Sequence, residues 1–576
     1  MSIPDKLFIL PSGSVNLQGR LGRMLRLTLE NRLKKVDYDK LAASFRNHED
    51  TDGRWRGEFW GKIVRSAIRI LQTTPDEELD AQIRKAVRDL CQCAYPDGAL
   101  STYTQDMRCW NWDVWGRKYA LLGLARYYRV MEQDPDVKEV IRRHVKALLV
   151  ENPFEERPTQ GRLWHDGLAT FSIMGGFVIA WRITGEKAFL DAAERLAQKG
   201  CHYGGTMLND FKSGKRPANL VNGKAYEMTS CVEGLLELYR ENGNREYLDL
   251  AEAYCQDILK CEMMITGTAG GKDAIGEYWF NCREKQCQEE PEFGMGETCV
   301  TATLLRFFFH LLRITGKSCY ADLIEYSVYN AAAGAMKYDG SWYMHCNPTP
   351  LAGKSWKIPA GDQLPGYGED CCLAQGPEAL GVGGVASVMG ASDGLTVNFY
   401  ENMTVNCQID GVPVKLEISG DYPSKSEITI KVSAAQEKLF TLALRIPQWC
   451  QNAKLELEDT SYIPAPGRYA QLKRIWKKDS VIKLVLPMDI VKIPAVDGSA
   501  RFALVRGPIL LAQDSRLGMV NEPVSLPGET PEQTVREGFC DVYTYSNGVK
   551  VCDYASAGSL FEENNTLCVW LKEQKN

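Results

Sequence analysis

The chain has 576 residues, 44% of them apolar, and its 68 basic and 74 acidic side chains leave a net charge of −6. This length exceeds what one hydrophobic core supports, so we expect roughly two to four domains. The apolar fraction excludes wholesale disorder, and the negative net charge gives no electrostatic reason to expect nucleic acid as a partner. The composition favours a large enzyme over a binding module or a filament.

From about residue 15 to 388 the apolar residues recur with helical spacing, as in LGRMLRLTLENRL and VEGLLELYRENG. Each helical run stops at a glycine or at an Asp/Pro pair, and a new run begins there. The junctions between successive runs fall at Pro75, Asp134, Gly185, Gly243 and Gly316. They are about 50–70 residues apart, the length of a helical hairpin with a long loop.

A hairpin of this kind cannot bury its apolar face alone, so neighbouring hairpins must stack on each other. We expect further outer helices around residues 18–35 and 376–388. The repeat therefore predicts a closed ring of six hairpins, an (α/α)6 barrel, as a catalytic domain over residues 15–388.

After residue 388 the apolar period changes to two, and short β-rich runs such as VKLEISG and EITIKVSA follow one another without intervening helices. Strands at such spacing indicate antiparallel sandwiches. We expect one β-sandwich over residues 389–500, a second, smaller one over 501–576, and an N-terminal segment, 1–14, that joins a sandwich. The predicted fold class is a multidomain α + β protein, an (α/α)6 helical barrel followed by antiparallel β-sandwich domains.

The nineteen cysteines are an odd number and lack the dense spacing of a disulfide scaffold. The amino end shows no basic stretch followed by an apolar core, so no signal peptide is expected. The longest apolar run, Leu304 to Leu312, contains His310 and is far shorter than the roughly 20 residues of a membrane span. These features predict a cytoplasmic protein with reduced thiols and no membrane partner.

The densest chemical stretch is residues 262–300, where a glycine-rich loop carries Glu277 and Glu297. Cys299 follows Glu297 by two positions, so the two side chains point the same way if the chain is locally extended. A second unusual feature is the adjacent pair Cys371 and Cys372, which comes before a helix expected to open at Gly376.

Each of these features has a plainer interpretation. A Glu-x-Cys pair arises often by chance, and adjacent cysteines are more often buried small apolar residues than ligands. Together, one carboxylate and three thiolates would complete a four-coordinate zinc site. His345 with Cys346, and Cys282 with Cys287, are rival sources of ligands.

The chain resembles glycoside hydrolase family 127, the β-L-arabinofuranosidases, over nearly its whole length. The matching motifs are ITGTAGGKDAIGE (265–277), GETC (296–299), YNAAAGAMKYDGSWYMHCNP (329–348), CC before a helix (371–372), LRIPQW (444–449) and VRGPILLA (505–512). The resemblance implies an (α/α)6 barrel with β-sandwiches, one zinc ion and a cysteine nucleophile.

Carried over residue by residue, the resemblance assigns the zinc ligands to Glu297, Cys299, Cys371 and Cys372. Cys371, the first of the pair, matches the nucleophile, and Glu277 matches the general acid/base. A retaining glycosidase needs a nucleophile on one face of the sugar and a proton donor on the other. A free thiol is a poor nucleophile at neutral pH, whereas a zinc-bound thiol stays deprotonated.

The sequence departs from the family pattern where substrate contacts are expected. The segment Gly116 to Tyr119 stands where the family has a Gly-His, so that Arg117 or Lys118 replaces one histidine, and Lys224 replaces another. The residues predicted to bind substrate are Arg117, Lys118, Tyr119, Lys224, Glu227 and His345. Fixed positive charges near the sugar would suit an acidic furanoside, whereas pairing of Lys224 with Glu227 would leave the pocket neutral.

The predicted function is a retaining exo-glycoside hydrolase that releases a terminal furanosyl residue, with β-L-arabinofuranose as the leading sugar and Zn²⁺ as cofactor. Its substrate would be a small oligosaccharide or glycoside, and the sandwiches could mediate a homodimer. The alternatives are the same mechanism on an acidic or otherwise modified furanoside, a non-catalytic carbohydrate-binding protein on this fold, and a uronate-processing enzyme on a similar barrel.

Overall fold

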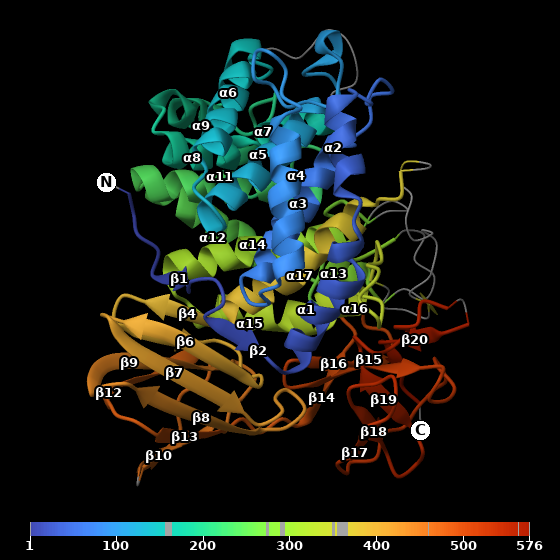
Figure 1. Cartoon of the computed structure of the whole chain (residues 1–576). Coiled ribbons are helices and arrows are strands. Elements are labelled where there is room, and N and C mark those ends of the chain that lie inside the picture. The colour runs from blue at the N-terminus through green and yellow to red at the C-terminus, as the bar shows by residue number, and fades with distance from the viewer. Residues whose placement is uncertain are drawn as a thin grey trace.

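A computed structural model of the chain describes residues 2–155, 164–271, 276–287, 294–347, 352–353, 364, 367–458, 460–562 and 564–574. A helical domain comes first and antiparallel sheets follow it, as the sequence predicts. Figure 1 shows the helices stacked on one side of the molecule and the sheets, from the carboxyl-terminal part of the chain, on the other.

Six helices of the described chain contact one another in a closed order, because each touches the next and the last touches the first. We call this set the ring. Its members are α3 (Gly57–Leu71), α5 (Asp113–Val130), α8 (Met174–Thr184), α11 (Ala225–Asn242), α14 (Thr298–Thr315) and α17 (Cys371–Ala386). Every residue of α17 and nearly every residue of α3 is buried, as expected for helices that are covered on all sides.

Each of the first five ring helices is followed by a helix that packs against it. These are α4 (Glu77–Cys91), α6 (Pro135–Glu151), α9 (Lys187–Gln198), α12 (Arg245–Asp257) and α15 (Ser318–Ser327). The helix α1 (Arg20–Asn31) packs against α17, and α2 (Tyr38–Arg46) packs against α3 and α4. Burial on α4 is confined to Leu79, Ile83, Ala86, Val87 and Leu90, the one-sided pattern of an outer helix.

The structure confirms all five predicted junctions. Gly185, Gly243 and Gly316 cap α8, α11 and α14 with φ of 77°, 71° and 65°, a left-handed conformation that glycine adopts without a steric penalty. The carboxylate of Asp76 caps α4, and α6 begins at Pro135. The local sequence therefore determines where each hairpin turns.

The helix expected at residues 376–388 differs from its prediction in two ways. α17 begins at Cys371, five residues earlier, and it belongs to the ring instead of lying outside it. Gly376, where the helix is expected to open, and Pro377 after it both lie inside α17. The start is set by the carboxylate of Asp370, which accepts hydrogen bonds from the backbone N–H groups of Cys372 and Leu373.

Two sheets follow the helical domain and share a hydrophobic core. One has the order β1 (Leu7–Ile9), β4 (Val388–Ala391), β5 (Gly394–Val397), β9 (Lys438–Ile446) and β12 (Arg468–Trp476). The other has the order β11 (Thr460–Tyr462), β10 (Lys454–Leu457), β13 (Ser480–Val485), β8 (Glu427–Ala434), β7 (Val412–Ser419), β6 (Met403–Ile409) and β2 (Val15–Leu17). All strand pairs are antiparallel except β5 with β9. The amino-terminal strands β1 and β2 pair with β4 and β6.

The last part of the described chain forms one branched sheet, where a second sandwich was expected. Its strands are β14 (Ile490–Pro494), β15 (Arg501–Arg506), β16 (Ile509–Asp514), β19 (Lys550–Asp553), β18 (Val542–Thr544) and β17 (Glu532–Thr534), with β20 (Thr566–Cys568), β21 (Leu571–Lys572) and β3 (Ala352–Gly353) beside them. Because β14 pairs with β15, this unit begins near residue 490 and not at 501. Its apolar face packs against Ile265 and Cys287 of the helical domain, which takes the place of a second sheet.

Two further features of the helical domain are the burial of α14 and the path of the amino-terminal segment. In the described chain, α14 is long and apolar enough to cross a membrane by length and composition, but 83% of it is buried inside the protein, as in a core helix. The amino-terminal segment passes the carboxyl ends of ring helices before β1, since backbone N–H groups of Ile3 and Lys6 donate to the carbonyls of Arg240 and Arg313.

Candidate active site

The predicted chemical residues meet at the amino-terminal ends of the ring helices. Cys371 and Cys372 are the first two residues of α17, and Cys299 is the second residue of α14. Asp370 and Glu297 immediately precede these two helices. The exposed N–H groups at a helix start favour negative charge, so this end of the ring suits thiolates and carboxylates.

Four buried side chains form a candidate metal site: Glu297, His345, Cys371 and Cys372, whose ligand atoms all lie within 4.8 Å of one another. The two thiols are 3.8 Å apart, and the Sγ of Cys372 lies 3.6 Å from Oε1 of Glu297. Three of the four are ligands that the sequence predicts. His345, predicted as a substrate contact and named as a rival ligand, joins them.

The position of His345 is set by two carboxylates. Its Nδ1 lies 3.2 Å from Oδ2 of Asp370, and its Nε2 lies 3.8 Å from Oε1 of Glu297. Burial alone would lower the pKa of this imidazole, but the charges of Asp370 and Cys371 raise it to about 9.

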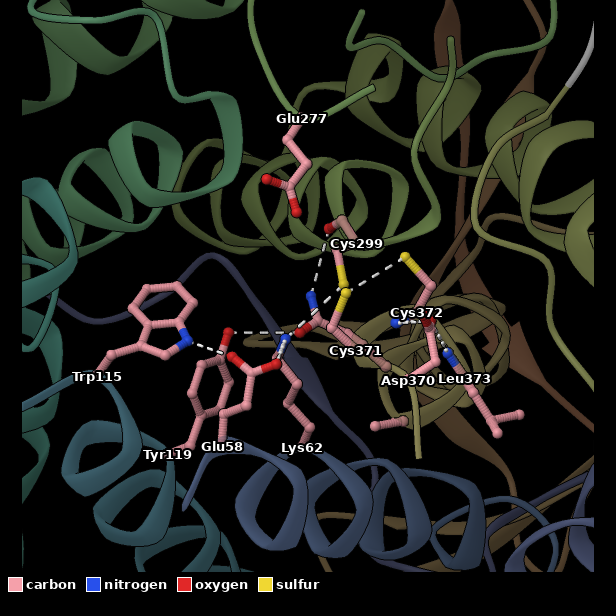
Figure 2. A network of polar contacts seen from close by, with 12 residues as sticks. Glu58, Lys62, Trp115, Tyr119, Glu277, Cys299, Asp370, Cys371, Cys372 and Leu373 are labelled. Atoms are coloured by element: carbon pink, nitrogen blue, oxygen red, sulfur yellow. Dashed lines mark hydrogen bonds and ion pairs between the residues drawn. The ribbon is translucent and has the colours of Figure 1, made fainter. Parts of the chain in front are cut away.

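Cys299, the remaining predicted ligand, lies beside the two other thiols (Figure 2). Burial favours its protonated form, yet hydrogen bonds from Cys371 and Cys372 and the charge of Lys62 lower its pKa to about 7. The hydrogen bond to Cys299 raises the pKa of Cys371, and burial raises that of Cys372, both well above the usual range. Without a metal ion, the thiol cluster therefore favours one thiolate, at Cys299.

The donor set fits a metal ion. In the described chain, Oε2 of Glu297 and Nε2 of His345 are buried and have no hydrogen-bond partner. Burial also raises the pKa of Glu297 well above its usual value. Soft thiols with one imidazole and one carboxylate are the ligands that zinc takes in proteins, and a bound cation would satisfy these orphaned atoms.

Lys62 on α3 lies next to this cluster, and its ammonium group is 3.8 Å from the Sγ of Cys299. It also pairs with Oε1 of Glu58 at 2.9 Å, and the indole of Trp115 donates to the other oxygen of Glu58. The ring of Tyr119 lies 5.1 Å from the ammonium. Figure 2 shows Lys62 and Glu58 on one side of the cysteines and Glu277 on the opposite side.

Glu277 reaches the cluster from a loop that is anchored to the start of α11. The backbone N–H of Ala225 donates to the carbonyl of Glu277 at 3.0 Å, and that of Trp279 donates to Gly223 at 2.8 Å. The buried ammonium of Lys224 forms an ion pair with the Glu277 carboxylate. The expected ion pair of Lys224 with Glu227 is therefore replaced by one with Glu277, because this loop lies against the helix start.

The other predicted substrate contacts lie in different surroundings. Glu227 lies one turn into α11, and burial raises its pKa to about 8. Tyr119 donates a hydrogen bond to Gln375 of α17 at 3.4 Å. Lys118 turns away from the cluster, 2.9 Å from the Ser172 hydroxyl. Arg117 points toward the outer helix α6, where it pairs with Glu151 at 2.6 Å, so the structure does not bring it to the thiols.

Sequence reasoning missed Glu58, Lys62 and Trp115. A signal was available, since Glu58 and Lys62 are four residues apart within the largely apolar run EFWGKIVRSAIRIL. A charged pair on the buried face of a helix is costly unless it has a partner or a function. That pattern could have marked α3 as a wall of the site.

The closed ring of helices holds a buried thiol cluster with a carboxylate facing it, and comparison with protein families places this chain among the glycoside hydrolases. Residues 14–380 match the family model described as the β-L-arabinofuranosidase GH127 catalytic domain, and residues 394–488 match the GH127 middle domain. The first match covers more than half of the chain. The protein belongs to glycoside hydrolase family 127.

Individual relatives are distant. A non-reducing end β-L-arabinofuranosidase from Bifidobacterium longum subsp. longum is 21% identical over 246 residues, which are 41% of this chain and 36% of that protein's length. The crystal structure of a GH127 β-L-arabinofuranosidase from Geobacillus stearothermophilus T6 aligns with a TM-score of 0.73 at 18% identity, over 97% of this chain and 100% of that one. The GH127 β-arabinofuranosidase BT3674 aligns with a TM-score of 0.78 at 17% identity, over 99% and 98%. At these identities the two structures support the fold.

Proposed function

We propose that the protein is a retaining exo-glycoside hydrolase that releases a terminal β-L-arabinofuranosyl residue. The nucleophile would be Cys371 and the general acid/base Glu277. The observation that carries this proposal is the arrangement in Figure 2, where the carboxylate of Glu277 and the thiol of Cys371 belong to opposite walls of one buried site. We also infer that the ring with its outer helices is the (α/α)6 barrel that the sequence predicts.

The residues that would hold zinc are Glu297, Cys371 and Cys372, with Cys299 or His345 as the fourth ligand. Bound there, zinc would supply the positive charge that keeps the thiols deprotonated at neutral pH. This contribution matters because the surroundings of Cys371 alone raise its pKa.

The chain's own residues would carry two steps. The Cys371 thiolate attacks the anomeric carbon while the glycosidic C–O bond breaks and Glu277 passes to the leaving oxygen a proton that it takes from the paired ammonium of Lys224. The sugar is then held through a C–S bond. Glu277 next takes a proton from a water molecule, which attacks the same carbon, and the C–S bond breaks to restore the thiolate. Two inversions at one carbon give net retention.

A neutral sugar is favoured by the ion pair between Lys224 and Glu277. Lys224 was the residue whose charge would have suited an acidic furanoside, and in the structure that charge serves the acid/base instead. The relative from Bifidobacterium longum is a β-L-arabinofuranosidase, which supports the same sugar. Cytoplasmic location, small glycosides as substrates and a homodimer stay predictions of the sequence.

The test is a product assay on aryl pentofuranosides and pentopyranosides of both anomeric configurations. We expect hydrolysis of the β-L-arabinofuranoside, with the β-anomer as the first product seen by proton NMR. Cys371→Ser and Glu277→Gln should each lower kcat/KM at least about 1,000-fold, as loss of a nucleophile or acid/base does. The exposed cysteine offers a matched control, since Cys319→Ser should keep full activity.

Two results would contradict the proposal. Full activity in either catalytic variant would exclude the mechanism, and inversion of configuration would exclude a covalent intermediate. Sugar binding without product on the whole panel would instead identify a non-catalytic carbohydrate-binding protein.

A further inference from the structure

A cavity of about 610 Å³ lies inside the helical domain, away from the thiol cluster. Its walls come from α3, α5, α8, α11 and α14, and residues 8–12 of the amino-terminal segment also line it. The thiols lie at the opposite, amino-terminal ends of α14 and α17. The proposed catalysis does not use this cavity, although its volume is that of an ordinary small-molecule site.

The lining of the cavity is strongly basic. Its described residues include Arg65, Arg69, Lys118, Arg126, Arg306 and Arg313. Glu233 and Glu237 are the acidic residues among them. Basic side chains are rarely buried without a matching negative charge, because removing a charge from water is costly.

The nearby carboxylates are largely engaged. Glu378 pairs with Arg126 at 2.6 Å, and Glu237 pairs with Arg182 and Arg240, which do not line the cavity. Asp5 of the amino-terminal segment pairs with Arg313 at 2.5 Å. These ion pairs neutralise individual arginines but leave an excess of positive charge inside the ring.

Two arginines show that excess most clearly. In the described part of the chain, the side chain of Arg65 makes no hydrogen bond or ion pair, and its guanidinium group lies 5.9 Å from the centre of the Tyr119 ring. Arg306 pairs with Glu233 at 3.3 Å through Nε, while its buried Nη1 finds no acceptor among the described residues. Burial and the neighbouring charges of Arg126 and Arg306 lower the pKa of Arg65 to about 10.

Helix dipoles do not account for this cluster. A cation near a helix carboxyl terminus gains only a small stabilisation, and the effect fades beyond the last turn. Arg65 and Arg306 lie more than one turn before the ends of their helices at Leu71 and Thr315. Their burial therefore needs another source of negative charge.

We propose that this cavity binds a small phosphate-bearing ligand, held by the guanidinium groups of Arg65 and Arg306 from two sides of the ring. A phosphate dianion accepts several charge-assisted hydrogen bonds at once, which matches arginines that converge from different helices. The volume leaves room for an organic group beside the phosphate.

Calorimetric titration of the full-length, zinc-loaded protein tests the proposal, with inorganic phosphate, pyrophosphate and ribose 5-phosphate as probes and chloride of equal ionic strength as the reference. We expect one site per chain and a rise of several degrees in Tm with the phosphate probes only. Arg65→Gln and Arg306→Gln should each weaken binding at least tenfold. Arg245→Gln, an exposed arginine on α12, is the control that should bind like the unaltered protein.

Folding of the variants is checked without ligand. Arg65→Gln removes an unpaired buried charge, so its Tm should equal or exceed that of the unaltered protein. Binding of ribose 5-phosphate alone would identify an organic phosphate, and equal binding of inorganic phosphate would identify the free ion; both support the proposal. It is overturned if no phosphate probe binds, if citrate binds and phosphate does not, or if Arg65→Gln and Arg306→Gln bind like Arg245→Gln.

Discussion

The two ends of the ring present opposite electrostatic problems. At the amino-terminal ends, three thiols and the carboxylates of Glu277 and Glu297 are buried together, with Lys62 and Lys224 as the neighbouring cations. At the carboxyl-terminal halves, arginines from α3, α5 and α14 outnumber the acids around one cavity. The chain therefore does not neutralise either end by itself. The thiol end needs a cation, and the cavity end needs an anion.

This division follows from the way the ring is built. Residues early in α3, α5, α14 and α17 contact one another, so these ring helices run in the same direction. Parallel helices place all their amino termini, which favour negative groups, at one end, and their carboxyl termini, which favour positive groups, at the other. Burial strengthens this weak preference of helix ends for one sign of charge. As a result, the candidate metal site lies at one end of the ring and the proposed anion site at the other.

The largest effect is expected from removing a ligand at the thiol end. Cys372→Ser should lower zinc affinity more than about 100-fold, since changes around a metal ligand already cost 10–100-fold. At zinc concentrations that saturate the unaltered protein, this loss corresponds to about 3 kcal/mol of unfolding free energy. Chelator competition and urea unfolding measure the two quantities.

The same measurements distinguish the fourth ligand. The resemblance assigns this role to Cys299, whereas His345 lies within the compact cluster. The loss of zinc affinity in Cys299→Ser and in His345→Gln is compared with that in Cys372→Ser. The variant that shows the same loss has lost the fourth ligand. Cys282→Ser, Cys287→Ser and Cys346→Ser should bind zinc normally, and loss of zinc in any of them would mean that the ligands are wrongly assigned.

A smaller effect is expected from the cation at the thiol end. Lys62→Met removes the ammonium beside Cys299 and should weaken zinc binding about tenfold, because a metal held by two or three thiolates and a carboxylate carries net negative charge. The double variant Glu58→Gln/Lys62→Met removes the ion pair as a whole. If it binds zinc as the unaltered protein does, the effect comes from an unpaired Glu58 and not from the lost cation. Lys187→Met on the exposed face of α9 is the control.

The smallest effect concerns Glu227, near the start of α11. Its folded pKa of about 8 exceeds the unfolded value near ~4.3, so the folded state holds a proton that the unfolded state releases over this range. Stability should therefore fall as pH rises from about 4.3 to 8. Glu227→Gln should remove this pH dependence of stability. At pH 8.5 the free energy of unfolding of the variant, measured with urea, should exceed that of the unaltered protein by on the order of 2 kcal/mol, with little difference at pH 4.

The exposed residue Glu456 on β10 provides the matched control, since Glu456→Gln should leave the pH dependence of unfolding unchanged. Equal slopes for both variants would show that Glu227 does not carry this dependence.

The sequence by itself determined the hairpin junctions, the change from helices to strands and the principal chemical residues. Caps such as Gly243 and Asp76 act through neighbours within a few residues, so local pattern suffices to find them. Short motifs contain the four residues of the candidate site that the sequence predicts, and the order of these motifs along the chain indicates the family. These residues are Glu277, Glu297, Cys371 and Cys372.

Only the tertiary structure decided which groups meet. Lys62 and Cys299 are 237 residues apart and touch because the ring closes. Lys224 pairs with Glu277 instead of Glu227 because a loop 53 residues away lies against its helix start. The arginines of the cavity are unremarkable in sequence, since each one alone resembles a surface residue. Their shared burial depends on five helices converging on one axis, which no local pattern encodes.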